Sequence, residues 1–179
     1  YLVLLVLFRS VLLPLKAIAM NALSLLASYG ALVVVFQEGY GASLLGFRPL
    51  GYVEATLPII TICLLFGLSM DYEVFLLSRI KEAWDSGAGN GRSVAAGLAS
   101  SGRVITNAAM IVVLVSLSFV TADVILVKAV GLGTALAVFL DATIVRALLV
   151  PAAMRLLGDL NWWAPGPLLR LLPATRPLD

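Results

Sequence analysis

Three carboxylate residues lie inside long apolar runs, where a charged group is costly. Asp71 and Glu73 occur in the segment Gly67-Leu-Ser-Met-Asp-Tyr-Glu-Val-Phe75, and Asp141 follows the apolar run Leu-Ala-Val-Phe-Leu140. An ionised side chain at the centre of a bilayer costs about 2.5–3.5 kcal/mol on insertion scales, and such residues are functional candidates by default. Their placement therefore indicates chemistry that takes place inside a membrane.

Asp71 and its neighbour Tyr72 form the sharpest candidate. Loss of water disfavours the ionised form of a carboxyl group, which can then bind and release a proton near neutral pH. A phenol donates a hydrogen bond to a carboxylate and rarely ionises itself. We therefore interpret the pair as a proton carrier with a hydrogen-bonding partner; the alternative is that Asp71 is one half of a permanent ion pair.

The residues around this pair are candidates for supporting it. Four residues would share one face of a helix because they are spaced four, four and three positions apart: Gly67, Asp71, Phe75 and Ser78. Glycine one turn from the carboxylate leaves room for a neighbouring helix. Glu73 is interpreted either as an anchor at the membrane surface or as a member of the same network.

Arg79, Asp141 and Arg146 are candidates for an intramembrane charge network. Arg79 also fits a basic anchor at the membrane surface. Asp141 and Arg146 are five residues apart, and side chains at that spacing do not share a face of an α-helix. We therefore expect each to pair with a residue of another helix, either as a packing interaction or for coupling.

Long apolar helices must position these residues. The chain has 179 residues, 61% hydrophobic and 12% charged, and its mean hydropathy is +1.07. Because a spanning helix needs about 20 apolar residues, the pattern predicts an all-α membrane bundle over residues 1–157. Its spans are expected at about 1–9 (partial), 15–37, 54–78, 104–120 and 124–150, with a loop at 79–103 and a tail at 158–179.

Basic residues are unevenly distributed between the ends of these spans. The connection between Arg9 and Lys16, the 79–103 loop and the tail are basic, whereas the opposite side carries only Arg48 and Lys128. Lys and Arg are enriched on the cytoplasmic side. We therefore expect a multi-pass protein of the bacterial inner membrane with a cytoplasmic C-terminus. Within the basic loop, Ser93 is expected to cap a short interfacial helix that ends at Leu98.

Several functional classes are excluded or disfavoured. The chain has no histidine and a single cysteine, Cys63, which is expected to be a small buried hydrophobe. Nucleophilic catalysis of the Ser-His or Cys-His kind is therefore impossible, and no metal site is expected. The segment Ser86–Ser93 lacks the first glycine and the lysine of a phosphate loop, and Asp71 and Asp141 lack the flanking motifs of an intramembrane aspartyl protease. We expect no enzyme activity and no cofactor.

The segment Gly67–Arg79 strongly resembles the MmpL (mycobacterial membrane protein large) transporters of the resistance-nodulation-division superfamily. Further agreement is found at Phe8-Arg-Ser10, Pro14-Leu-Lys-Ala17, Gly102-Arg-Val-Ile-Thr106, Leu140-Asp-Ala-Thr143, Leu149-Val-Pro-Ala152 and Asn161-Trp-Trp163. The resemblance covers nearly the whole chain and corresponds to the C-terminal membrane half, so we expect a fragment whose N-terminal half and periplasmic domains lie outside this sequence.

The resemblance implies proton-driven export of lipids or other hydrophobic molecules by a transporter built from two similar halves. Asp71 and Tyr72 would face an Asp-Tyr pair of the other half as a proton relay, and the surrounding residues, Phe75 among them, form an inhibitor pocket in some members. The alternative is a sterol-sensing or protein-translocation accessory protein of the same superfamily. Expected partners are membrane lipids, a hydrophobic substrate, the other half of the protein and, in a homo-oligomer, further copies; no nucleic acid is expected.

Overall fold

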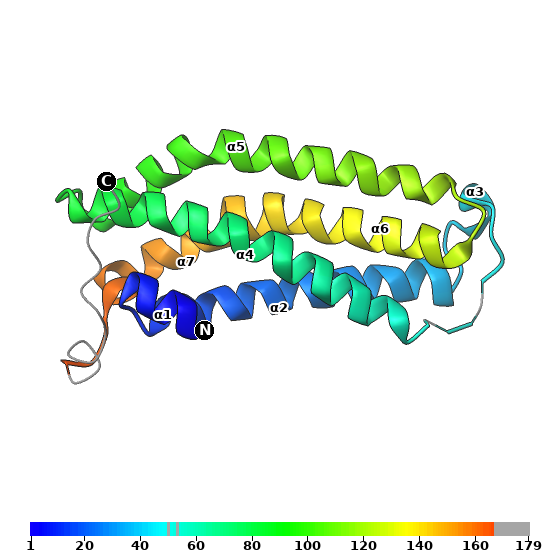
Figure 1. The fold of residues 1–179 in the computed structure, drawn as a ribbon, viewed down its shortest axis with the longest axis horizontal. Helices are drawn as coiled ribbons and strands as arrows, with labels where there is room; N and C mark the ends of the chain where they lie inside the picture. The colour runs from blue at the N-terminus through cyan, green and yellow to red at the C-terminus, as the bar shows by residue number, and fades with distance from the viewer. Residues whose placement is uncertain (50, 53, 167–179) are drawn as a thin grey trace.

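A computed structural model describes residues 1–49, 51–52 and 54–166, and it is a bundle of long helices with no strand in the described residues (Figure 1). Four helical stretches are long and apolar enough to cross a membrane: Leu12–Gln37, Thr56–Asp85, Asn90–Thr121 and Ile125–Trp162. The predicted fold class, an all-α bundle of four full spans and a shorter fifth helix, is thereby confirmed.

The elements follow one another along the chain as mostly antiparallel helices (Figure 1). The first part contains α1 (Leu2–Phe8), α2 (Leu12–Leu32), its continuation η1 (Val33–Gln37) and the short α3 (Ala42–Leu45). The second part contains α4 (Thr56–Asp85), α5 (Asn90–Ser118), η2 (Phe119–Thr121), α6 (Ile125–Leu140), η3 (Asp141–Leu149), α7 (Val150–Leu157) and η4 (Gly158–Trp162). We call the end formed by the α4–α5 turn, α7 and η4 the basic end.

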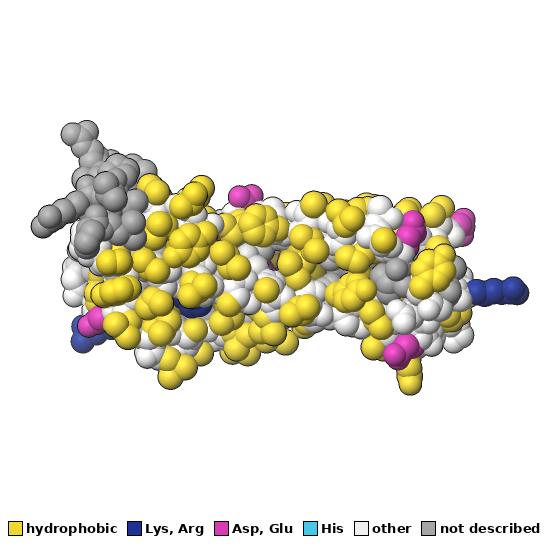
Figure 2. All heavy atoms as spheres, turned by 90° about the horizontal axis from the view of Figure 1, so that it is seen from below, with side chains coloured by type: hydrophobic (Ala, Val, Ile, Leu, Met, Phe, Trp, Pro, Cys, Tyr) yellow, Lys and Arg dark blue, Asp and Glu magenta, His cyan; other side chains and the backbone are white. Residues whose placement is uncertain are grey.

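The flank of the bundle is apolar. In Figure 2 hydrophobic side chains cover most of its length, and the charged side chains gather mainly toward the two ends. Large apolar residues such as Leu26, Ile111 and Leu148 are strongly exposed on the long helices. A soluble protein does not expose so long an apolar surface, so this distribution fits helices that are surrounded by hydrocarbon.

Glycines allow the helices to approach one another closely. A Cβ atom on Gly131 would lie 2.6 Å from the Ser116 carbonyl oxygen, and one on Gly97 would lie 2.3 Å from Ile80 Cγ1 and 2.9 Å from its backbone nitrogen. Gly133 packs against Leu32 in a similar way. Small residues replace the hydrophobic driving force between helices in a membrane by allowing tight van der Waals packing, so these glycines help to hold the helices together.

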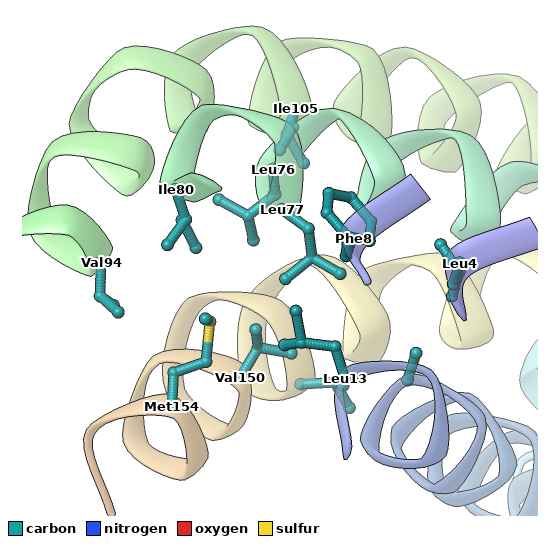
Figure 3. Packing of buried hydrophobic residues seen from close by; sticks show 12 residues of the cluster. Leu4, Phe8, Leu13, Leu76, Leu77, Ile80, Val94, Ile105, Val150 and Met154 are labelled. Atoms are coloured by element: carbon teal, nitrogen blue, oxygen red, sulfur yellow. The ribbon is translucent and has the colours of Figure 1, made fainter. Parts of the chain in front are cut away.

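The largest buried apolar cluster lies toward the basic end, and we call it the basic-end core (Figure 3). It joins α1, α2, α4, α5, η3 and α7, and its members include Phe8, Leu13, Leu77, Ile80, Val150 and Met154. The tail is held to this end by Asn161, which is fully buried and donates to the carbonyl oxygens of Met154 and Gly158 at 2.7 and 2.6 Å.

The stretch 79–103 is mostly helical, where a loop was expected. α4 continues to Asp85, α5 begins at Asn90, and only a short turn separates them. Salt bridges along α4, Arg79 to Glu82 and Lys81 to Asp85, support the extension. Low hydropathy therefore marks where these helices leave the apolar region, and not where they end.

Two smaller predictions are also corrected. Ser93 lies inside α5, its hydroxyl donating to the Ala88 carbonyl oxygen at 2.9 Å, so it caps no separate helix. Cys63 is exposed, because it lies on a face of α4 that none of the described elements covers. Residues 167–179 of the predicted tail lie outside the described residues.

Candidate functional site

Asp71 lies at the middle of the 30-residue helix α4 and is exposed on the surface of the bundle. The predicted span 54–78 would place Asp71 nearer to one end of its helix, and it lies at the middle because α4 extends to Asp85. No hydrogen bond or ion pair joins the Asp71 side chain to another described residue. A carboxylate at mid-helix thus faces whatever surrounds this chain.

The residues predicted to share a face with Asp71 lie along this exposed side of α4. Cys63 and Gly67 precede it at intervals of four residues and are exposed, while Phe75 and Ser78 follow it and are partly exposed. A Cβ atom on Gly67 would meet nothing within 4 Å. We call the surface formed by Cys63, Gly67, Asp71, Phe75 and Ser78 the open face of α4.

Tyr72 connects the open face to the interior. Its ring is partly buried, and the Arg146 guanidinium carbon lies 5.4 Å from the ring centroid. A guanidinium within about 6 Å of an aromatic face is attracted to it by the ring quadrupole. Tyr72 therefore lies next to Asp71 in the chain and contacts the buried Arg146 guanidinium with its ring.

Arg146 and Asp141 form an ion pair inside the bundle. Arg146 Nη2 lies 2.5 Å from Asp141 Oδ2, and the two side chains are only 5% and 6% exposed. The same Nη2 also lies 3.0 Å from both the carbonyl oxygen and the hydroxyl of Ser69. Removing either partner of such a pair leaves a buried charge without compensation.

The expectation that Asp141 and Arg146 do not share a helix face is wrong, because they pair with each other, although each also contacts another helix through Ser24 or Ser69. Residues 141–149 form a π-helix, in which the backbone bonds span five residues, as in the bond from the Val150 N–H to the Val145 carbonyl oxygen. This wider turn brings side chains at i and i+5 to one face, whereas an α-helix does not. Such π-helical segments are often found at functional sites.

Small polar side chains of α2 and α4 complete the surroundings of this ion pair. The Ser69 hydroxyl lies 2.7 Å from Asn21 Oδ1 and 3.2 Å from Asp141 Oδ2, either of which can accept its proton. Ser24 donates to Asp141 Oδ1 at 3.3 Å. The sequence analysis did not identify Asn21, Ser24 or Ser69. A signal was present for the first two, because Asn21, Ser24 and Ser28 recur on one helical face of an otherwise apolar run.

Glu73 and Lys16 are also buried, with exposed fractions of 4% and 7%. Glu73 projects to the interior, and Arg146, Lys16 and Asp141 act on its carboxyl group electrostatically. Lys16 was interpreted as part of a basic connection outside the membrane; it lies instead within α2, because that helix begins at Leu12. Pro14 is tolerated there, since the first turn of a helix has no intrahelical partner for its nitrogen.

Arg79 does not join this group. Its side chain is about half exposed, pairs with Glu82 at 2.9 Å and lies with its guanidinium carbon 5.6 Å from the Phe75 ring centroid. Of the three residues predicted as a charge network, the structure brings together Asp141 and Arg146 and places Arg79 at the surface.

Long apolar helices around buried, paired charges are typical of a polytopic membrane protein with a polar site inside its helix bundle. The model of the MMPL family matches residues 1–171, and the chain belongs to this family. It is 43% identical over 173 residues to the mycolic acid-containing lipids exporter MmpL11 of Mycolicibacterium smegmatis, covering 97% of this chain and 18% of that protein.

Two further relatives show similar agreement. The trehalose monomycolate exporter MmpL3 of M. smegmatis is 44% identical over 158 residues, covering 88% of this chain and 16% of that protein. The heme uptake protein MmpL11 of Mycobacterium tuberculosis is 43% identical over 181 residues, covering 99% and 19%. The chain thus spans less than a fifth of the length of these relatives.

Proposed function

We propose that this chain is the C-terminal membrane part of a transporter that exports lipids or other hydrophobic molecules. Export is driven by the proton gradient. The relatives named as exporters of mycolic acid-containing lipids and of trehalose monomycolate support a lipid cargo. By the positive-inside rule the basic end faces the cytoplasm, in keeping with a multi-pass inner-membrane protein that transports and does not catalyse.

The observation that carries this proposal is the Asp71 carboxylate at the middle of a spanning helix, on a face that residues 1–49, 51–52 and 54–166 leave uncovered. A charged carboxylate facing hydrocarbon is unstable. It must either bind a proton or be covered by polar groups from elsewhere in the protein. The Asp-Tyr pair expected on the other half would supply such groups, and Asp71 with Tyr72 would then exchange protons with it.

In this mechanism Asp71 binds a proton from one side of the membrane and releases it to the other. Each proton that crosses supplies about 2.3 kcal/mol per 100 mV of membrane potential, plus the contribution of any pH gradient. The packed helices transmit that energy, since a rigid bundle moves as a unit. The cargo is handled by parts of the protein outside this sequence.

The test replaces Asp71 by Asn in the full-length protein, reconstituted in phosphatidylethanolamine and phosphatidylglycerol vesicles. Proton uptake is followed with a trapped pH-sensitive dye, and cargo with a labelled mycolic-type lipid or heme. We expect Asp71→Asn to abolish uptake, because an amide cannot carry the proton, and Asp71→Glu to retain part of it. The matched control is Glu82→Gln, an exposed carboxylate on the same helix. Coupled transport that persists in Asp71→Asn would refute the proposal.

A further inference from the structure

Lys16 on α2 and Glu73 on α4 are buried charges that lack the partners such groups normally have. Lys16 Nζ and Glu73 Oε1 are both buried, and neither has a hydrogen-bond partner among the described residues. The ion pairs among the described residues join Arg79 to Glu82, Lys81 to Asp85 and Arg146 to Asp141. Lys16 and Glu73 take part in none of them.

This arrangement does not fit an ion pair whose only role is packing. A buried charge without hydrogen bonds costs several kcal/mol, and a stable buried pair needs good geometry and satisfied lone pairs. The neighbouring Asp141–Arg146 pair makes a direct contact and gains further hydrogen bonds from Ser24 and Ser69, although Arg146 Nη1 has no partner among the described residues. A carboxyl group can remove its own penalty by binding a proton, whereas an amide or a fixed ion pair cannot.

Four buried charged residues from three elements form one group, which we call the inner tetrad: Lys16, Glu73, Asp141 and Arg146. Two are acidic and two are basic, so their formal charges cancel when all are ionised. Arg146, Lys16 and Asp141 act on the Glu73 carboxyl group, while α1 and α5 meet this region with the apolar Phe8 and Ile105. When Glu73 binds a proton, the tetrad gains one uncompensated positive charge.

The position of Glu73 suits a step that follows Asp71. The two residues are two positions apart on α4, which turns their side chains about 200° from each other. Asp71 faces outward and Glu73 inward, with Tyr72 between them beside Arg146. Beyond Glu73, one turn closer to the basic end, Leu76, Leu77 and Ile80 of the basic-end core are fully buried (Figure 3).

We propose that Glu73 is a second proton-binding residue of the transport cycle, with Lys16 as its counter-charge. This inference rests on the proposed function, which supplies the proton. The proton leaves the Asp71 carboxyl group, which becomes a carboxylate, and it binds the Glu73 carboxylate, which becomes a neutral acid. It is released to water at the basic end when the basic-end core admits water, and Glu73 returns to its charged form.

The consequence is a mechanical one. With Glu73 neutral, the Lys16 ammonium stays in the apolar interior without its counter-charge, a state that favours movement of the start of α2 toward water. Lys16 is one turn into α2, next to the α1–α2 connection, so this connection is the element that would move. Proton binding would thus be coupled to a displacement of α1 and α2.

The test compares single and double substitutions in the full-length protein, in the same vesicle assay. Glu73→Gln is expected to lower proton uptake about 100-fold, the size of effect typical of a lost proton-transfer group, and Glu73→Asp is expected to retain much of it. The decisive variant is Lys16→Gln/Glu73→Gln, which removes both buried charges. It should fold but remain without uptake, because no proton-binding group is present at position 73.

Restored uptake in the double variant would overturn the inference, since it would show that Glu73 only balances Lys16. The Asp71→Asn variant tests the proposed function separately. If Asp71→Asn loses proton uptake while Lys16→Gln/Glu73→Gln keeps it, only the second proton-binding residue is refuted. If the position 73 variants fail to insert, infrared difference spectra of the Asp71→Asn protein between two pH values decide, because Glu73 is unchanged in this variant. A protonated-carboxyl band that remains in Asp71→Asn is the expected result, and its absence refutes the inference.

Discussion

The two faces of α4 carry polar residues in very different surroundings. On the interior face, the residues spaced four apart are all buried, and three of the four are polar: Thr61, Leu65, Ser69 and Glu73. On the open face, Cys63, Gly67 and Asp71 have the same spacing and all three are exposed. One helix therefore presents buried residues on one side and, on the other, an exposed acidic side chain without a partner among the described residues.

This difference teaches which part of the machinery is self-contained. Ser69 is surrounded by Asn21, Asp141 and Arg146 of the same chain, so the polar contacts of this interior residue are made within the described residues. Asp71 has no such contacts within the described residues. A membrane protein satisfies intramembrane charges within its own structure, so the open face is where we expect the other half to pack.

The largest effect should follow from breaking the interior ion pair. Asp141→Ala leaves the Arg146 guanidinium buried without a counter-charge, and we expect the free energy of unfolding to fall by about 3–5 kcal/mol. Replacing both residues, as in Asp141→Leu/Arg146→Met, should restore most of that stability. Thermal unfolding of the detergent-solubilised full-length protein measures both. If Asp141→Ala were as stable as Asp71→Asn, the contrast between the two faces would be broken.

A smaller effect is expected where α5 contacts the interior face. Gly97→Ala places a Cβ atom 2.9 Å from the Ile80 backbone nitrogen, a distance so short that α4 must shift to accommodate it. Overpacking of this kind lowers the free energy of unfolding by about 1–3 kcal/mol. Gly102→Ala, on the same helix with nothing within 4 Å, is the matched control and should be neutral or stabilising.

Gly67→Ala extends this experiment to the open face. Within this chain the added Cβ atom meets nothing, so a loss of stability in the full-length protein as large as that of Gly97→Ala would report a helix of the other half packed against Gly67. An unchanged melting temperature would instead mean that the open face lies against lipid.

The smallest effect distinguishes two serines of α4. Ser69→Ala removes a hydroxyl that contacts Asn21, Asp141 and Arg146, and we expect a loss of about 1–3 kcal/mol because buried polar partners are left unsatisfied. Ser78→Ala, on the open face, should change stability by less than about 0.5 kcal/mol. Equal losses from both substitutions would show that the open face is as tightly bonded as the interior.

The sequence pattern predicted the number of spans because each requires a long apolar run, and such runs are a local property. It predicted the Asp71 face of α4 for the same reason, since spacings of four and three place residues together on any α-helix. It failed for Asp141 and Arg146, because the change from an α-helix to a π-helix depends on packing and is not visible in the spacing. It also failed for Lys16, whose burial depends on where α2 begins.

By itself, the sequence determined that this is a polytopic helical membrane protein and that an acidic residue and a phenol lie side by side in a span, because hydropathy and residue order are read directly from the chain. Only the tertiary structure decided which charges meet. The electrostatic interactions of Glu73 with Lys16, Asp141 and Arg146 join residues that are up to 73 positions apart, and burial depends on how the helices pack together. It was packing, too, that placed Asp71 outside this bundle while Glu73, two residues later, lies within it.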